Sequence, residues 1–152
     1  MRTIDLTRGF VAIVDDEDYA RVSGFKWYLH GCGFHGYYAR TACRKLMHRF
    51  IISPPNGLPV DHKNGDKLDN RKSNLRVCTV AGNQHNRGAR SDNTSGFKGV
   101  SFHKSARKWV AVICLDSKNR HLGCFATKED AARAYNEAAI ILHGAFAKLN
   151  TL

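Results

Sequence analysis

The 152-residue sequence has no long hydrophobic run, although 43% of its residues are hydrophobic. No window is long and apolar enough to cross a bilayer, which takes about 20 consecutive apolar residues. The first ten residues, MRTIDLTRGF, contain no apolar segment of the kind found in a secretory signal peptide. We therefore expect an intracellular protein that is not secreted and has no membrane partner.

The cysteines lack the spacing of metal-binding or redox motifs, because no two of them form a Cys-x-x-Cys pair. An odd number of scattered cysteines without a secretion signal predicts reduced thiols that serve as small core residues. The alternative is a structural zinc site, which would have to combine a distant pair with histidines. The five cysteines are Cys32, Cys43, Cys78, Cys114 and Cys124.

Acidic residues are scarce, with 13 Asp and Glu against 24 Lys and Arg and a net charge of +11. The net charge is −1 over residues 1–39, +8 over residues 40–90 and +4 over residues 91–152. This basic excess predicts a nucleic-acid partner, because each phosphate that is neutralised releases counterions. The alternatives are a merely soluble basic protein or one that binds anionic membranes, and no basic amphipathic helix supports the latter.

The middle of the chain, LPVDHKNGDKLDNRKSNLRVCTVAGNQHNR at residues 58–87, combines the groups that phosphodiester hydrolysis needs. Asp61 has a hard anionic oxygen of the kind that Mg²⁺ or Mn²⁺ prefers, and Asn83 has a neutral carbonyl oxygen. His62 points away from Asp61 if the segment is extended, and an imidazole can accept a proton from water near neutral pH. Asn74 stands in a turn, where its amide can fasten the loop to the backbone.

The run VDHKNGDKLDNRKSNLRVCTVAGNQHN resembles the HNH endonuclease family, in the branch common in phages and mobile introns whose third signature position is Asn. The resemblance implies a ββα-metal motif, in which a two-stranded hairpin packs on a helix with one divalent ion between them. It implies that His62 is the general base and Asn74 the middle structural Asn of the catalytic site. It also implies that Asp61 and Asn83 are the metal ligands.

The last position of this motif has two candidates, Asn83 and His85. Asn83 follows His62 by 21 residues, which suits a strand, a loop, a second strand and the first turn of a helix. We prefer Asn83 because it falls four residues after Thr79, a good helix N-cap, whereas His85 would face another side of that helix.

Residues 1–52 are predicted to form a β-rich extension, which resembles the N-terminal part of phage HNH nucleases. Strands are expected at 10–14, 26–30 and 36–42, the last two joined by the GCGFHG turn. The acidic run 15–18 predicts the solvent-facing start of a short helix rather than a metal site. A second helix is expected at 45–51, ended by two prolines. In this region, Arg44, Lys45 and Arg49 are predicted to contact DNA phosphates. The alternative is that they form a solvated helix face.

The C-terminal part is predicted to be a three-stranded sheet with one helix, after a small polar linker. Strands are expected at 99–103, 108–115 and 120–125, and a helix from about Lys128 to His143 with Thr127 as its cap and Gly144 as its stop. A single helix leaves the other face of the sheet bare.

The C-terminal part contains the motifs FKGV, KW, LGCF, EDAARAYNEAA and AKLN. These motifs resemble the plant ethylene-response-factor and Apetala class of DNA-binding domains, which also occurs fused to HNH nucleases. The resemblance implies that the outer face of the sheet enters the major groove. Alternation predicts that Trp109, Ala111, Ile113 and Leu115 face the helix, and that Lys108, Val110, Val112 and Cys114 face outward. Val112 and Cys114 stand where that family has Arg or Glu, and His121 stands where it has Trp. The remaining candidates suit phosphate positioning better than base reading, and Val110 and Val112 either touch thymine methyls or meet the N-terminal part. The candidates are Lys98, Ser101, His103, Arg107, Lys108, Asn119, Arg120 and His121.

Together these features predict an α+β protein with an extension at 1–52, a nuclease motif at 53–90, a linker at 91–95 and a DNA-binding domain at 96–152. The expected function is a homing or phage-encoded endonuclease that uses one divalent cation, Mg²⁺ or Mn²⁺, to nick or cleave double-stranded DNA in the host cytoplasm or nucleoid. We expect a monomer, with pairing on DNA as the alternative. A non-catalytic DNA-binding regulator is the competing hypothesis. RNA binding ranks last, since the aromatic pattern of single-strand binders is missing.

Overall fold

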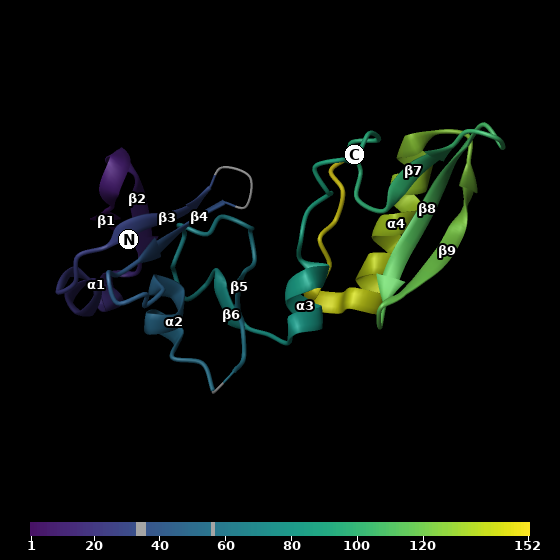
Figure 1. Cartoon of the computed structure of the whole chain (residues 1–152). Helices are drawn as coiled ribbons and strands as arrows, with labels where there is room; N and C mark the ends of the chain where they lie inside the picture. Colours follow the sequence, from purple (N-terminus) through teal and green to yellow (C-terminus); the bar gives the residue numbers. More distant parts are fainter. Residues whose placement is uncertain (33–35, 56) are drawn as a thin grey trace. The chain divides into compact units, whose positions relative to one another are not determined.

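The computed structural model describes residues 1–32, 36–55 and 57–152. The chain divides into two compact units, residues 1–83 and 84–152, each with hydrophobic core residues of its own. The mixed class predicted from the sequence is confirmed, because the described residues form small antiparallel sheets and four α-helices (Figure 1). Among these helices none combines the length and the apolar character that crossing a membrane requires.

Two hairpins open the N-terminal unit. Strand β1 (Arg2–Asp5) pairs with β2 (Val11–Val14) around a short 3₁₀ turn, η1 (Thr7–Gly9), and β3 (Tyr28–Cys32) pairs with β4 (Gly36–Arg40). Three of these strands match the predicted ones to within two residues at most ends. β1 was not predicted, and the tip of the GCGFHG turn lies outside the described residues.

Two short helices pack beside the hairpins. α1 (Asp16–Ser23) begins as predicted, whereas α2 (Met47–Ile52) begins two residues later than the predicted helix. The reason is local, because Leu46 has an extended backbone and forms a β-bridge with Arg40. Ser53 ends α2 in a left-handed conformation immediately before the two prolines.

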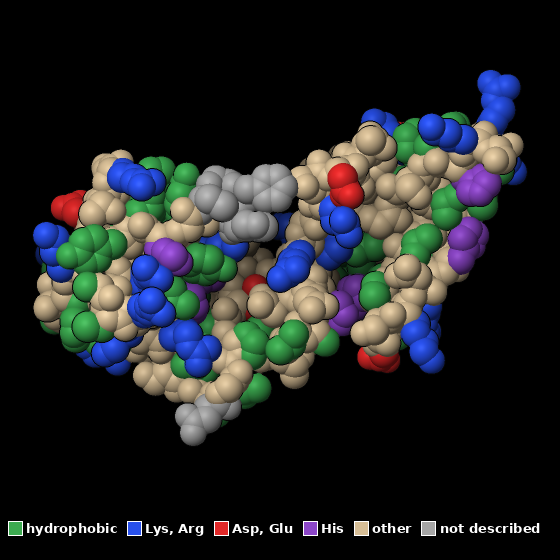
Figure 2. All heavy atoms as spheres, in the orientation of Figure 1, with side chains coloured by type: hydrophobic (Ala, Val, Ile, Leu, Met, Phe, Trp, Pro, Cys, Tyr) green, Lys and Arg blue, Asp and Glu red, His purple; other side chains and the backbone are tan. Residues whose placement is uncertain are grey.

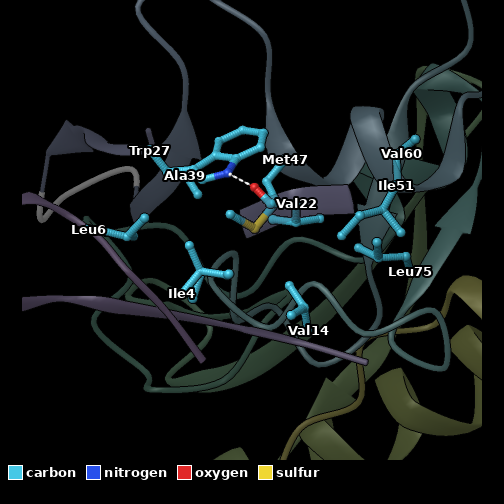
Figure 3. Close-up of a cluster of buried hydrophobic side chains, with 11 residues drawn as sticks. Ile4, Leu6, Val14, Val22, Trp27, Ala39, Met47, Ile51, Val60 and Leu75 are labelled. Atoms are coloured by element: carbon cyan, nitrogen blue, oxygen red, sulfur yellow. Dashed lines mark hydrogen bonds between the residues drawn. The ribbon is translucent and has the colours of Figure 1, made fainter. Parts of the chain in front are cut away.

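The core of the N-terminal unit includes the nuclease-like hairpin (Figure 3). Met47 of α2 is fully buried, and the Trp27 indole N–H donates to the carbonyl of Val22 at 2.9 Å. Val60 and Leu75, from the next two strands, belong to the same cluster. The predicted extension at 1–52 therefore shares one core with the segment that carries Asp61 and His62.

The nuclease-like segment is a hairpin followed by a helix. Strand β5 (Val60–His62) pairs antiparallel with β6 (Leu75–Val77), so that Asp61 lies opposite Arg76 and His62 opposite Leu75. Helix α3 (Val80–His85) follows directly. Its N-terminus is capped as predicted, because the backbone N–H of Gly82 donates to the Thr79 hydroxyl at 3.1 Å.

The acidic start of α1 does not simply face solvent. Asp15, Glu17 and Asp18 bring carboxylate oxygens within 4.8 Å of one another, and Asp18 is buried. The Lys72 ammonium lies 2.7 Å from Glu17 and 3.2 Å from Asp18, and the Lys72 backbone N–H donates to Asp15 at 2.8 Å. This cluster thus binds a lysine of the Asn-rich loop and holds that loop against α1.

The C-terminal unit is a three-stranded antiparallel sheet in the order β7 (Val100–His103), β8 (Lys108–Leu115), β9 (Lys118–Phe125). Helix α4 (Lys128–His143) covers one face of this sheet, and a 3₁₀ turn, η2 (Gly144–Phe146), follows it (Figure 1). The Thr127 hydroxyl caps α4 by accepting from the Asp130 backbone N–H.

The inward face of β8 is largely as predicted, since Ala111 and Ile113 are buried in the clusters that include α4 residues. Val110 differs, because it was expected on the outer face but is only 9% exposed. Ser101 and Cys124 lie opposite it on the two neighbouring strands, and a central strand is shielded from both sides. A β-bulge after Ala111 also interrupts the simple alternation.

The predicted linker is hydrogen-bonded. Ser95 is buried and its hydroxyl contacts the Val100 carbonyl at 2.8 Å, while Asn93 donates to the Phe97 carbonyl and accepts from the backbone N–H of Gly96. Residues 91–95 are therefore fastened to the start of β7 instead of being loosely held.

Candidate active site

Asp61 occupies the middle of β5, where its side chain meets Arg76 across the hairpin. Asp61 is only 6% exposed. Its Oδ2 accepts hydrogen bonds from Nη2 of Arg76 at 2.6 Å and from Nε of Arg76 at 2.9 Å. A charge-assisted contact of this kind offsets much of the cost of burying a carboxylate. The site thus contains one buried anionic oxygen donor whose charge is balanced by a guanidinium.

His62 follows Asp61 in an extended strand, so its side chain lies on the other face of the hairpin. The ring is 5.0 Å from the ring of His48 and 6.3 Å from that of Tyr38. Burial lowers the pKa of His62, while a hydrogen bond with Asn70 and the charge of Asp61 act in the opposite direction. The imidazole is therefore neutral near pH 7 and able to accept a proton.

The aromatic residues around His62 were not predicted from the sequence. His48 on α2 is buried, and burial together with the neighbouring His62 lowers its pKa to about 3. Tyr38 on β4 contacts both imidazoles. The three rings come from three elements, so His62 is held between packed neighbours in a fixed orientation.

Asn74 closes the loop between β5 and β6. Its Oδ1 accepts from the backbone N–H of Asn64 at 3.0 Å, and its Nδ2 donates to the carbonyl of Asp69 at 2.8 Å. Asp69 is also buried, and its contacts with Arg71 lower the pKa of its carboxyl. Asn74 thus joins the start of the loop to its far side, immediately before Leu75, which lies opposite His62 in the hairpin.

Asn83 and His85 lie in very different surroundings on α3. Asn83 is half-buried, and its carboxamide makes no hydrogen bond within the described part of the chain. His85 stacks flat on His143, with ring centroids 3.7 Å apart and an angle of 7° between the planes. Asn83 therefore keeps its oxygen available for a ligand, whereas the ring of His85 is used in packing.

Asp61 and Asn83 offer donor atoms of the kind that a hard divalent cation prefers. Asp61 supplies a carboxylate and Asn83 a carboxamide, both oxygen ligands, and Mg²⁺ commonly binds to one or two carboxylates while water and phosphate complete its shell. The Arg76 guanidinium already contacts Oδ2 of Asp61, so an ion bound there would share this carboxylate with an arginine. The carboxylate cluster found among the described residues, at the start of α1, binds the Lys72 ammonium through Glu17 and Asp18.

The basic residues predicted to contact phosphate in the N-terminal unit separate into two kinds. Arg44 is exposed and lines a hollow on the surface. The Lys45 ammonium lies over the rings of Phe25 and Phe50, and Nη1 of Arg49 donates to the carbonyl of Leu58. The last two cations therefore make contacts within the protein, Lys45 with two aromatic rings and Arg49 with a backbone carbonyl.

The predicted contacts of the C-terminal unit are exposed, except for Lys98. Burial and the nearby Lys148 lower the pKa of Lys98 to about 8, and its ammonium donates to the His85 carbonyl. The exposed residues are Ser101, His103, Arg107, Lys108, Asn119, Arg120 and His121. They belong to β7, β8, β9 and the turn between β7 and β8. By the strand register, Arg120 lies opposite Ile113, which packs against α4, whereas His121 lies opposite Val112 on the other face.

The cysteines depart from the predicted core role. Cys78 is buried, but Cys43, Cys114 and Cys124 are exposed, and all four are free thiols. Two of the exposed residues are on β8 and β9, and a sheet that has a helix on one face only leaves its other side chains in solvent.

Comparison with known proteins identifies the family. A family model described as HNH endonuclease matches residues 53–85. An uncharacterized HNH endonuclease of Acanthamoeba polyphaga mimivirus is 32% identical over 152 residues, covering 95% of this chain and 77% of the relative. Protein 3.8 of Escherichia phage T7 is 31% identical over 94 residues, covering 62% of this chain and 77% of that protein.

Plant transcription factors match about half of the chain. The ethylene-responsive transcription factor ERN1 of Medicago truncatula is 39% identical over 85 residues, which cover 55% of this chain and 31% of the transcription factor. No solved structure matches the chain. Because the mimivirus relative is similar along nearly the whole sequence, the chain belongs to the HNH endonuclease family.

Proposed function

We propose that this protein is a metal-dependent endonuclease that nicks double-stranded DNA. The observation that carries the proposal is the position of Asp61 and His62 on adjacent sites of β5. One side chain is a buried carboxylate and the other a buried imidazole with a lowered pKa. In this reading β5, β6 and α3 form the ββα-metal motif.

The proposed chemistry divides between the two faces of the hairpin. His62 takes the proton of the attacking water, which a neutral imidazole can do at cellular pH. Asp61 and Asn83 would hold one Mg²⁺ or Mn²⁺, which when bound stabilises negative charge on the departing oxygen. Asn74 positions the loop beside His62 through its hydrogen bonds to Asn64 and Asp69.

Positive charge and the relatives of the C-terminal part support DNA as the substrate. The net charge is +11, and transcription factors such as ERN1 match about half of the chain. We propose that residues 53–90 cut the strand and that residues 96–152 hold the duplex through the exposed face of their sheet. The match to a phage T7 protein supports the phage-encoded type. One metal site in each chain favours a monomer that nicks a single strand.

A second candidate is a DNA-binding regulator that has lost catalysis. The Arg76–Asp61 pair favours it, because a guanidinium already occupies the oxygen that would otherwise contact the ion. In that case the hairpin serves only as a scaffold.

Incubation of supercoiled plasmid with and without Mg²⁺ separates the two functions. The nuclease converts the plasmid to open circles only with the metal, and His62→Ala lowers the rate by about 10²- to 10⁴-fold without loss of DNA binding. Val11→Ala, which alters an exposed side chain of the same unit away from the site, is the control. Wild-type protein that binds the plasmid and never nicks it would favour the regulator.

A further inference from the structure

A surface hollow lies on the β3–β4 hairpin, outside the predicted metal site. Its volume is about 660 Å³. The lining comes from both strands of the hairpin and from the turn that precedes α2. The lining residues are His30, Gly31, Gly36, Tyr38, Arg40, Arg44 and Leu46.

The cationic groups of this hollow have no acidic partner. Neither Arg40 nor Arg44 forms an ion pair with a carboxylate in the part of the chain that the structure describes. Among the described residues, the Arg40 side chain contacts His30, at 3.4 Å from Nη1 to Nε2. Uncompensated guanidinium groups around a hollow attract an anion. Figure 2 shows Lys and Arg side chains gathered around histidines on the visible face of the N-terminal unit.

Arg44 is held in place by its backbone. Its φ is 63°, in the left-handed region that non-glycine residues rarely adopt. Its N–H donates to the Thr41 carbonyl at 3.0 Å, and the backbone N–H of Lys45 donates to the Thr41 hydroxyl at 3.1 Å. A hydrogen-bonded turn therefore presents this arginine in a fixed direction.

The hollow is connected to the proposed catalytic base through Tyr38. This ring lines the hollow, and its centroid is 5.5 Å from the ring of His48 and 6.3 Å from the ring of His62. The Lys67 ammonium also lies over the Tyr38 ring, at 4.7 Å. A chain of direct ring contacts thus joins the anion-attracting surface to His62.

We propose that this hollow binds backbone phosphates of the DNA strand that is to be cut, with Arg40 and Arg44 as the phosphate contacts. The proposal rests on the proposed function and adds to it the path of the substrate strand across the N-terminal unit. In this proposal one strand lies across the hairpin while a neighbouring phosphate reaches His62. Planar guanidinium groups are suited to phosphate oxygens.

The test measures binding of a fluorescein-labelled DNA duplex in EDTA, so that cleavage plays no part, at a series of salt concentrations. Each lost phosphate contact lowers the slope of log affinity against log salt by about 0.9. We expect Arg44→Gln to weaken DNA binding by about tenfold and to lower the salt slope by about 0.9. The double variant Arg40→Gln/Arg44→Gln should lower the salt slope by about 1.8. Thermal unfolding of each variant checks that the fold is intact.

Arg8→Gln is the matched control, because Arg8 is an exposed arginine of the same unit with a φ of 65°. It removes the same charge and is expected to leave the slope unchanged. Equal salt slopes for wild type and the double variant would overturn the proposal. Binding of free phosphate in the hollow, with the same duplex affinity in wild type and the double variant, would also overturn it. A plasmid assay of wild type decides the nuclease function separately, since nicking with unchanged slopes would refute only the hollow.

Discussion

Nη2 of Arg76 lies 2.6 Å from Oδ2 of Asp61, directly across the β5–β6 hairpin. Both side chains are largely buried, so the ion pair is part of the interior of the unit and not a surface contact. Removing one partner of a buried pair leaves the other charge without compensation, which costs about 3–5 kcal/mol.

We predict that Arg76→Gln lowers the free energy of unfolding by about 3 kcal/mol in EDTA. Added Mg²⁺ or Mn²⁺ should stabilise this variant more than wild type, because the ion supplies positive charge beside Asp61. Urea unfolding with and without metal measures both effects. Arg90→Gln, which breaks an exposed pair with Asp92, should cost less than about 1 kcal/mol. Equal metal responses in Arg76→Gln and wild type would argue against Asp61 as a ligand.

Acid should destabilise the protein through His48. The pKa of His48 is about 3 in the folded state and near 6.5 when the chain is unfolded, so the unfolded chain binds the proton more readily. The stabilising contribution is complete above pH 6.5 and is lost as the pH falls toward 3. Between these two pKa values, the free energy of unfolding falls by up to about 1.4 kcal/mol for each pH unit.

His48→Phe keeps a ring against Tyr38 and His62 but cannot titrate. We predict that its free energy of unfolding falls less steeply than that of wild type between pH 6.5 and pH 4, as measured by urea unfolding at several pH values. Identical slopes for the two proteins would mean that His48 is not buried as a neutral ring.

Asn74→Ala should loosen the loop beside His62. The substitution removes the hydrogen bonds to Asn64 and Asp69, and each is worth about 1 kcal/mol. We predict a loss of about 2 kcal/mol in stability together with slower nicking. Asn74→Asp keeps the acceptor and loses the donor, so it should lie between Asn74→Ala and wild type. A stable Asn74→Ala variant with full activity would remove this residue from the site.

Replacement of Arg107, Lys108 and Arg120 by Gln tests the exposed basic residues of the C-terminal sheet. If all three contact phosphates, the salt slope should fall by about 2.7 and binding to unrelated sequences should weaken equally, since phosphate contacts carry no sequence information. Duplex binding at several salt concentrations gives the slope. Arg133→Gln on α4 is the control, because Arg133 is exposed and paired with Asp130. A sequence-dependent loss would instead indicate that these residues read bases.

Local patterns allowed much of the fold to be predicted. Helix α4 begins and ends where its Thr127 cap and Gly144 indicate, and the Thr79 cap fixes the start of α3. Strand β1 was missed although Ile4 and Leu6 are buried at alternate positions, because it is only four residues long. The late start of α2 depends on a bridge between Leu46 and Arg40, which no helical pattern reveals.

The sequence by itself determined the order of Asp61, His62, Asn74 and Asn83, because residues on one hairpin and the helix after it are related by short, fixed spacings. Only the tertiary structure decided what surrounds them. Tyr38 and His48 meet His62 from separate elements, and Lys72 donates to Asp15 across 57 residues of chain. Contacts of this kind depend on how elements pack, and packing leaves no period in the sequence.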